Sequence, residues 1–474
     1  MDKPVVRISV RNLVEFILRS GDLDNRRGSA DKEAMLKGSR LHRKIQSQMG
    51  SHYRAEVSLK YTTEYDDVSI AVEGRADGIF TEDEQYFIDE IKGVYADVSQ
   101  LEKPVEVHRA QAMCYAWIYA REQQLEKIGV QMTYGNLDTE ELKYFREEFA
   151  LEELKDWYQE LLDRYHKWIS YQLAWKKERN ESMEDLEFPF EYREGQRKIV
   201  SSVYHTISAE RQIFIQAPTG VGKTMSTIFP AVRAVGAGLG ENIFYLTAKT
   251  ITRTVAEEAF LILKEHGLKF KVITITAKEK LCFCDKTECN PENCLWARGH
   301  LDRINDAVYE LWTTQDCYDR ETILEYAKKW QVCPFELCLD LAIWVDAVIC
   351  DYNYVFDPNV YLKRFFGEGT SGGYIFLIDE AHNLVDRGRE MYSAFVDRAD
   401  VLEAKKLAAD YSKGLVRALG KVNRQLLALE KDCGDYEILQ NPGPVSLSML
   451  QVMGEMDKLL EELHGKELPE QLLN

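Results

Sequence analysis

Long apolar runs are missing from this sequence, and proline and glycine are scarce. No stretch of about 18 apolar residues, the length a membrane-spanning helix needs, occurs in the 474 residues. Only 11 prolines and 28 glycines are present, which excludes collagenous and low-complexity chains. The first twenty residues are interrupted by Arg7, Arg11, Glu15 and Arg19, so they lack the apolar core of a secretory signal. We therefore expect a cytoplasmic protein without a membrane partner.

Positive charge is also in deficit, with 60 Lys and Arg against 79 Asp and Glu and a net charge of −19. Neutralising nucleic-acid phosphates requires Lys and Arg, so an acidic total first argues against such a partner. Net charge does not describe a local groove, however, and metal-binding carboxylates themselves add negative charge. Nucleic acid is therefore not excluded. At roughly 100–200 residues per domain, the length indicates three or four domains.

Cysteine is unevenly distributed. Seven of the ten cysteines lie between Cys282 and Cys338. In a reducing compartment such clustering points to metal or redox chemistry rather than to a framework of disulfides.

The hydrophobic pattern predicts an α/β multidomain chain. Residues 1–135 mix helical stretches with strands, and residues 136–185 are expected to be a helical linker. Its Trp157, Trp168 and Trp175 are expected to pack against other helices rather than to stack on bases. The N-terminal strands are expected at Tyr53–Tyr61, Val68–Glu73, Arg75–Phe80 and Gln85–Lys92, the last two forming a hairpin.

From residue 186 the pattern changes to short apolar strands that alternate with helices, which is typical of a parallel sheet covered on both faces. This lobe is predicted over 186–280 and 340–392. It is interrupted by a cysteine-rich insertion over 281–339 and followed by a helical segment over 393–474. The expected strands are Gln212–Ala217, Ile243–Thr247, Val272–Thr276, Ala347–Asp351 and Tyr374–Asp379.

A glycine-rich loop follows the first of these strands, with the sequence Ala217-Pro-Thr-Gly-Val-Gly-Lys-Thr224. Phosphates bind to a concave row of backbone N–H groups, which glycines make accessible, and the N-terminus of the next helix adds its positive end. The pattern predicts that Lys223 reaches the β- and γ-phosphates of ATP and that Thr224 holds Mg²⁺. The ATP-binding residues are predicted to be Gln196, Thr219, Gly220, Val221, Gly222, Lys223 and Thr224.

A second motif typical of ATP-hydrolysing proteins accompanies the loop: an apolar strand ends in Asp379-Glu-Ala-His382. Asp379 is predicted to hold the hydrated Mg²⁺, and Glu380 to orient or deprotonate the attacking water. His382 is predicted to couple the nucleotide state to the rest of the protein.

With these two motifs, residues 186–400 resemble a superfamily 2 DNA helicase with a DEAH box, of the XPD/DinG family. The resemblance implies a RecA-like lobe in which Gln196 reads adenine and Tyr245–Thr254 contacts single-stranded DNA. It also implies ATP-driven movement in the 5′→3′ direction, on single-stranded and forked DNA, in repair or recombination. Such motors have two RecA-like lobes. Because only one is recognisable here, we expect a longer protein and poor ATP hydrolysis by this portion alone.

Four cysteines, Cys282, Cys289, Cys294 and Cys333, form the predicted metal-ligand set. Their spacing alone fits zinc and an iron–sulfur cluster equally well. The helicase resemblance, together with Leu281-Cys282 and Cys333-Pro-Phe335, implies a [4Fe–4S] cluster. Either Cys284 or Cys317 could replace a member of the set.

In the N-terminal region, Asp77 precedes Glu90-Ile-Lys92 by thirteen residues. Residues two apart on a strand share a face, so Glu90 and Lys92 would flank one site, with Asp77 arriving from the hairpin partner. Two carboxylates can chelate Mg²⁺ or Mn²⁺, and Lys92 can position a metal-activated water. Taken alone, this spacing also fits an ordinary acidic hairpin.

Further residues, His42, Glu56, Gln111 and Tyr115, make the region resemble the RecB-type and CRISPR-associated exonuclease branch of the PD-(D/E)xK nucleases. The resemblance implies a metal-dependent DNA nuclease with His42 as an additional metal ligand. The preferred interpretation is a nuclease fused to an iron–sulfur helicase. The alternatives are an ATP-responsive DNA-binding platform that does not unwind, and a zinc-stabilised scaffold without either activity.

Overall fold

The computed structural model describes residues 3–25, 32–218, 220–248, 250–367 and 370–463. It divides into two units, Met1–Leu384 and Val385–Asn474. Among the described residues, no helix combines the length and the apolar character that crossing a membrane requires.

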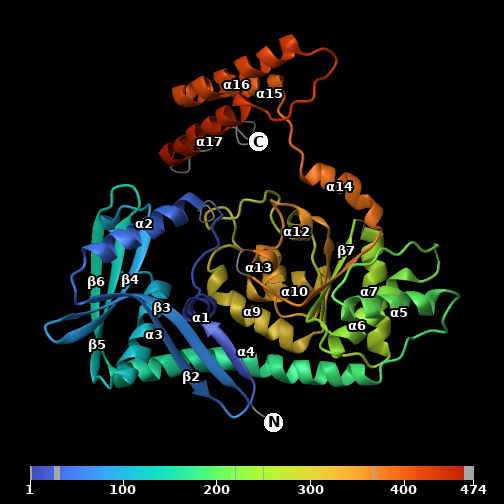
Figure 1. Cartoon of the computed structure of the whole chain (residues 1–474), viewed down its shortest axis with the longest axis horizontal. Coiled ribbons are helices and arrows are strands. Elements are labelled where there is room, and N and C mark those ends of the chain that lie inside the picture. The colour runs from blue at the N-terminus through green and yellow to red at the C-terminus, as the bar shows by residue number, and fades with distance from the viewer. Residues whose placement is uncertain (1–2, 26–31, 219, 249, 368–369, 464–474) are drawn as a thin grey trace. The chain divides into compact units, whose positions relative to one another are not determined.

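The N-terminal region is built on a mixed sheet whose described strands lie in the order β1-β3-β4-β5-β6, with β2 paired to β3 (Figure 1). The pairs β1–β3 and β4–β5 are parallel, and the others are antiparallel. The strands are β1 (Val5–Ser9), β2 (Tyr53–Glu64), β3 (Ser69–Glu82), β4 (Gln85–Val94), β5 (Lys127–Asn136) and β6 (Leu142–Ala150).

Helices α1 (Val10–Ile17), α3 (Glu106–Glu122) and α4 (Leu151–Glu184) share one apolar core with this sheet. Helix α3 is buried along most of its length, since its residues from Ala110 to Ala120 are all buried. Helix α2 (Lys32–Gln48) packs Leu41 and Ile45 against Ile91 of β4 in a separate small cluster. A short 3₁₀ turn, η1 (Val98–Gln100), precedes α3.

Two expectations for this region need correction. The strands expected at Val68–Glu73 and Arg75–Phe80 are one continuous strand, β3. The predicted helical linker begins with β6, and its helix starts only at Leu151. The apolar residues of β6 also fit helical spacing, and pairing with β5 decides in favour of a strand. The expected hairpin is confirmed, because Glu82 of β3 pairs with Gln85 of β4.

The second sheet is parallel throughout, as predicted, and its described strands lie in the order β11-β7-β10-β8-β9. Its strands are β7 (Asn242–Thr247), β8 (Val272–Thr274), β9 (Cys317–Tyr318), β10 (Ala347–Asp351) and β11 (Tyr374–Ile378). We call residues 186–384 the P-loop lobe. Its helices outside the cysteine-rich insertion are α5 (Gln196–Ser208), α6 (Lys223–Gly236), α7 (Thr250–Glu265), α12 (Asn353–Phe356) and α13 (Lys363–Phe366).

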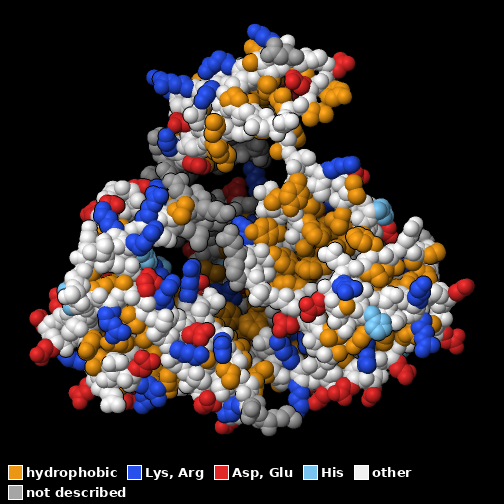
Figure 2. Space-filling model, in the orientation of Figure 1, with side chains coloured by type: hydrophobic (Ala, Val, Ile, Leu, Met, Phe, Trp, Pro, Cys, Tyr) orange, Lys and Arg blue, Asp and Glu red, His pale blue; other side chains and the backbone are white. Residues whose placement is uncertain are grey.

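The expected strand before the glycine-rich loop is not formed, because the described residues 211–218 have no strand pairing. Phe214 is 91% exposed. Strand β11 is therefore an edge of the described sheet, and its Phe376 is 41% exposed. Figure 2 shows hydrophobic side chains gathered on the visible face of this lobe. An apolar run identifies a strand-forming sequence, but the hydrogen-bonding partner that completes a strand is a tertiary property.

The cysteine-rich insertion, residues 281–339, is mainly helical, and it also adds an edge strand to the sheet. Strand β9 pairs with β8 and buries Tyr318. The helices of this region are α8 (Lys278–Leu281), α9 (His300–Thr314), α10 (Arg320–Trp330) and α11 (Pro334–Ala342).

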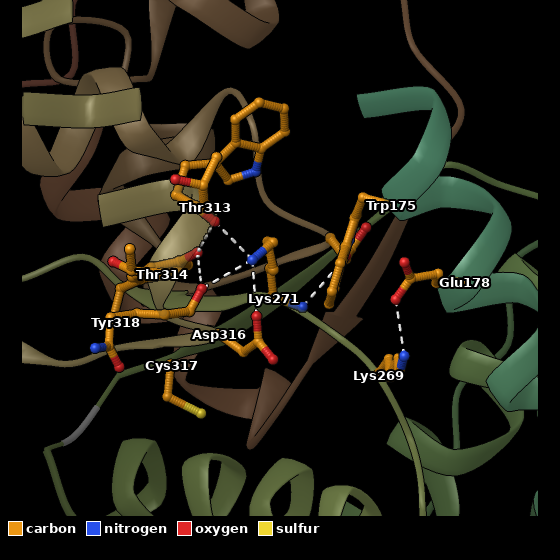
Figure 3. A network of polar contacts seen from close by, with 12 residues as sticks. Trp175, Glu178, Lys269, Lys271, Thr313, Thr314, Asp316, Cys317 and Tyr318 are labelled. Atoms are coloured by element: carbon orange, nitrogen blue, oxygen red, sulfur yellow. Dashed lines mark hydrogen bonds and ion pairs between the residues drawn. The ribbon is translucent and has the colours of Figure 1, made fainter. Parts of the chain in front are cut away.

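Helix α4 connects the two sheets through a buried polar junction (Figure 3). The Asp346 carboxylate accepts hydrogen bonds from Arg179 Nη1 at 2.7 Å, Trp175 Nε1 at 2.9 Å and the Lys271 amide at 2.8 Å. The buried Lys271 ammonium lies 4.1 Å from the Trp175 ring centroid and 2.7 Å from Asp316 Oδ1. It also donates to the carbonyl oxygens of Trp312 and Gln315 at the end of α9, where a cation is favoured.

Trp168 of α4 packs against another helix, as predicted, whereas Trp175 contacts Asp346 and Lys271 at the polar junction. Trp168 stacks on Trp312 with ring centroids 5.9 Å apart, and Trp157 packs against the N-terminal core.

We expect Asp346→Asn to lower the free energy of unfolding by about 3–5 kcal/mol, because it leaves the Arg179 charge buried without a counter-ion. Arg179 and Asp346 side chains are only 7% and 5% exposed. The matched control is Glu178→Gln, which breaks the half-exposed Lys269–Glu178 pair seen in the same view and should leave the free energy of unfolding nearly unchanged. Urea unfolding of the two variants measures both values, and equal costs would contradict a structural role for the junction.

The second unit is helical. Its elements pack around a small apolar core that includes Val401, Leu415, Val422 and Leu459. The helices are α15 (Arg398–Leu407), α16 (Lys413–Asp432) and α17 (Pro444–Leu463), with the 3₁₀ turn η3 (Ala408–Asp410). Helix α14 (Leu384–Met391) and the 3₁₀ turn η2 (Ala381–Asn383) precede them.

Candidate nucleotide, cysteine and carboxylate sites

The glycine-rich loop ends in the N-terminus of α6, which begins at Lys223. Gly220 and Gly222 have φ angles of +85° and +78°, a left-handed conformation that glycine adopts without strain. The N-terminal amides of α6 are therefore directed to where an anion would bind. Thr219 lies outside the described residues. The loop has the local geometry expected of a phosphate-binding turn.

Gln196 contacts this loop from α5. Its side chain is buried, and a Cβ atom at position 222 would lie 2.7 Å from Gln196 Nε2, so this close approach depends on glycine. Gln196 Oε1 accepts a hydrogen bond from the Arg193 amide at 3.0 Å, and the Arg193 guanidinium donates to the Gly220 carbonyl. Sequence reasoning did not single out Arg193. Its only signal was its position three residues before Gln196.

The residues predicted to handle Mg²⁺ converge on Tyr245 of β7. Burial raises the pKa of the Tyr245 hydroxyl, and the side chains of Asp379 and Thr224 lie close enough to influence it. Burial raises the pKa of Asp379 above its usual range, and the neighbouring Glu380 carboxylate adds to the increase. The sequence placed Tyr245 in a DNA-contacting segment. The Tyr245 side chain itself lies between the loop and the acidic motif, and the DNA contact of the segment stays a prediction.

Glu380 faces the loop. Its Oε1 lies 3.5 Å from Lys223 Nζ, and its Oε2 lies 3.4 Å from His382 Nδ1. Tyr352 holds the turn by donating its hydroxyl to the backbone carbonyls of Asp379 and Glu380. The His382 side chain is 74% exposed. Lys223, Thr224, Asp379 and Glu380 are thus brought together, with His382 at the rim.

Five cysteines line one cavity, which we call the cysteine cavity. Lys278, Phe283, Trp296 and Phe335 also line it. Cys284 Sγ lies 3.8 Å from Cys294 Sγ, and burial raises the pKa of the Cys333 thiol to about 11. The cysteines of the cavity are Cys282, Cys284, Cys289, Cys294 and Cys333.

The four predicted ligands and one of the two possible replacements therefore share the cavity. Cys317 does not line it, because it lies on β9 beside Lys264. Over the described ranges, no three His, Cys, Asp or Glu side chains are close enough together to form a metal site as they stand. Five thiols in one cavity with aromatic walls are nevertheless a donor set that fits a thiolate-ligated metal centre.

The N-terminal carboxylate site combines residues of β3, β4, α2 and α3. Asp77 Oδ1 lies 3.4 Å from His42 Nδ1, and its Oδ2 accepts a hydrogen bond from the Ile91 amide at 2.7 Å. Lys92 Nζ lies 2.8 Å from Glu90 Oε1 and 3.1 Å from Gln111 Oε1. The hydroxyl end of Tyr115 packs over Gly74, where a Cβ atom would lie 2.6 Å from Tyr115 Oη.

Glu90 is the most perturbed acid of this site. Burial, followed by the Asp77 carboxylate, raises the pKa of Glu90 to about 8, and its Oε2 has no hydrogen-bond partner among the described residues. A buried carboxylate with a free oxygen near a second carboxylate is suited to receiving a cation. Glu56 does not join the site directly. It pairs with Arg75 at 2.7 Å, and Gln46 links it to the Asp77 carbonyl.

Asp89, which sequence reasoning missed, is fully buried on the opposite face of β4. It accepts hydrogen bonds from Tyr53, Gln131 and Thr133 at 3.0, 3.1 and 2.6 Å. Burial raises the pKa of Asp89. This network fixes β4 to β2 and β5 next to Glu90.

Residues 247–401 match the DEAD_2 family. The chain is similar to the Fanconi anemia group J protein homolog of Gallus gallus, with 30% identity over 116 residues, or 24% of this chain and 9% of that protein. It is also similar to the regulator of telomere elongation helicase 1 homolog of Caenorhabditis briggsae, with 22% identity over 43% of this chain and 24% of that protein.

A solved structure described as an XPD helicase aligns with 57% of this chain and 47% of its own length, at 16% identity and a TM-score of 0.38. The chain therefore spans less than half of each of these proteins. The segment that contains the acidic motif is of the DEAD_2 type, and the resemblance seen in the sequence is supported over this part of the chain.

Proposed function

We propose that this chain is part of an ATP-driven DNA helicase of the XPD type, fused to a metal-dependent DNA nuclease domain. The observation that carries the helicase proposal is the convergence of Lys223, Thr224, Asp379 and Glu380 at the edge of a parallel sheet, within a segment of the DEAD_2 type. One of the similar proteins, matched over 43% of this chain, is named as a helicase.

In this proposal the α6 N-terminus and Lys223 bind the ATP phosphates. Gln196, whose side chain is held by the Arg193 amide, contacts the adenine. Mg²⁺ would be held by Thr224 and Asp379, with Tyr245 fixing the distance between them. Glu380 then orients the attacking water. Its present contact with Lys223 would be exchanged for contacts with nucleotide and water when ATP binds.

Strand displacement on forked DNA tests the proposal. We expect ATP hydrolysis to be stimulated by single-stranded DNA, and unwinding to require a 5′ tail rather than a 3′ tail. Stimulated hydrolysis without displacement by the full-length protein would instead favour an ATP-responsive platform. The absence of both nucleotide turnover and DNA binding would leave only a scaffold.

The cysteine cavity is proposed to hold a [4Fe–4S] cluster on Cys282, Cys289, Cys294 and Cys333. Bound there, the cluster would supply four strong thiolate bonds that cross-link the insertion, which is too small to have a large apolar core of its own. Iron, sulfide and zinc analysis of anaerobically purified protein tests this assignment. A centre that contains only zinc would contradict it.

The carboxylate site is proposed to bind Mg²⁺ or Mn²⁺ through Asp77 and Glu90, with His42 beside them. A bound divalent ion would make water a better nucleophile at neutral pH. Lys92, held between Glu90 and Gln111, would orient that water and offset the charge of the scissile phosphate. Mn²⁺-dependent cleavage of single-stranded DNA in the absence of ATP is the expected activity, and its loss in Lys92→Ala would assign it to this site.

A further inference from the structure

A short segment that follows α1 contacts the cysteine-rich insertion along its whole length. We call residues Leu18–Asn25 the strap. Three backbone hydrogen bonds join it to the insertion: Leu301 N to the Gly21 carbonyl at 3.0 Å, Leu23 N to the Ala297 carbonyl at 2.9 Å, and Asn25 N to the Cys289 carbonyl at 2.9 Å. The last of these ends on a residue of the cysteine cavity. The strap is therefore joined to the insertion through every second residue from Gly21 to Asn25.

Side chains strengthen this pairing at the start of α9. Asp22 Oδ1 accepts a hydrogen bond from the Gly299 amide at 2.6 Å, and Asp302 Oδ1 accepts one from the Gly21 amide at 2.8 Å. Gly299 is the N-cap of α9, so the Asp22 carboxylate lies where a negative charge is favoured by the helix dipole. These contacts fix the position of the next residue of the strap, Leu23.

Leu23 lines the cysteine cavity together with the five cysteines, and among the described residues it is the one cavity residue outside the insertion and its flanks. The other apolar walls, among them Phe283, Trp296 and Phe335, come from residues 278–335. One wall of the cysteine cavity is thus formed by the N-terminal region of the chain, through Leu23.

The strap is anchored at its N-terminal end by Arg19. Its guanidinium lies 2.7 Å from Asp340 Oδ2 on α11 and donates to Asn305 Oδ1 on α9, also at 2.7 Å. Asn305 returns a hydrogen bond to the Phe16 carbonyl at the end of α1. Burial lowers the pKa of Arg19 to about 10, so its side chain remains charged at neutral pH. Helix α1 belongs to the N-terminal core, and the strap therefore ties that core to the insertion.

We propose that the strap is a wall of the metal centre, through which a metal bound by the cysteines ties the N-terminal domain to the P-loop lobe. This inference rests on the proposal that the cysteine cavity holds a metal. Leu23 excludes water and small reagents from the thiolates, and the hydrogen bonds at Cys289 and Ala297 hold Leu23 in place. Because the two events share contacts, metal binding and strap docking stabilise each other to the same degree.

Metal release tests the shielding role. The protein is purified anaerobically with its metal, and a soluble chromogenic chelator is added in excess. The release of iron or zinc is followed by the absorbance of the metal–chelator complex. We expect Leu23→Ser to release metal at least about fivefold faster than the unaltered protein, the lower end of typical coupling between sites. The control is Leu295→Ser, which alters a 64% exposed leucine of the same insertion that does not line the cavity. Its release rate should be unchanged.

Hydrogen exchange of the unaltered protein tests the reciprocal effect without a variant. Removal of the metal should abolish the protection of the Leu23 and Asn25 amides and leave that of the β4 amides unchanged. Metal content distinguishes the possible failures. If the protein binds neither iron nor zinc, the metal-centre proposal and the strap proposal both fail. If metal is bound but release is equally fast in Leu23→Ser and exchange does not respond to metal, only the strap proposal is overturned.

Discussion

Replacing Lys223 with alanine is expected to reduce DNA-stimulated ATP hydrolysis by roughly 10²–10³-fold, the loss typical of removing one preorganised group that stabilises transition-state charge. Lys223 is the first residue of α6, and its ammonium lies 3.5 Å from Glu380 Oε1. Under the proposed function, the variant would deprive the ATP phosphates of the lysine in this loop, and Glu380 loses the cation that faces it. Hydrolysis measured at saturating single-stranded DNA gives the size of the effect, and binding of a fluorescent ATP analogue separates loss of affinity from loss of turnover.

The matched control is Lys198→Ala, which removes an exposed lysine from the neighbouring helix α5 and should leave hydrolysis unchanged. Mn²⁺-dependent DNA cleavage should survive in Lys223→Ala, and Lys92→Ala should have the opposite pattern. Equal loss of both activities in either variant would contradict two separate sites.

The sequence was most informative where chemistry requires neighbouring residues. The glycine-rich loop and the Asp379-Glu380 pair each lie within a few residues, and their local geometry follows from glycine conformations and a strand end. The parallel sheet followed from apolar runs of strand length. The Glu90–Lys92 contact followed from the two-residue period of a strand, together with the hairpin that brings Asp77 beside them.

Contacts between distant segments could not be predicted in the same way. Tyr245 lies between Thr224 and Asp379 only because β7 and β11 are adjacent in the sheet. Residues 211–218 are apolar enough for a strand, yet they have no pairing partner among the described residues. The strap carries no motif at all, since its role depends on backbone hydrogen bonds to a segment more than 260 positions away.

Replacing Glu90 with glutamine is expected to change the N-terminal carboxylate site in two opposite ways. It removes a charged oxygen donor, so Mn²⁺-dependent cleavage should fall by more than about 100-fold, beyond the usual effect of altering a supporting residue. It also removes the cost of holding a carboxylate in a buried position. Because burial raises the pKa of Glu90 to about 8 from 4.5, the folded metal-free protein binds a proton that the unfolded chain releases between these two pH values. Stability therefore falls as pH rises across this window.

The loss of stability caused by the buried Glu90 carboxylate is absent below about pH 4.5 and complete above about pH 8. Its full size is a few kcal/mol, because each tenfold change in proton affinity corresponds to about 1.4 kcal/mol. Glutamine does not titrate, so metal-free Glu90→Gln should have a higher unfolding midpoint than the unaltered protein at pH 9, and the difference should shrink toward pH 5. Thermal unfolding in the presence of a chelator measures this dependence. The control is Glu84→Gln in the exposed β3–β4 turn, which should shift neither cleavage nor the pH profile. A Glu90→Gln variant that lost stability equally at both pH values would show that Glu90 is a structural partner of Lys92, rather than a strained carboxylate that a divalent ion relieves.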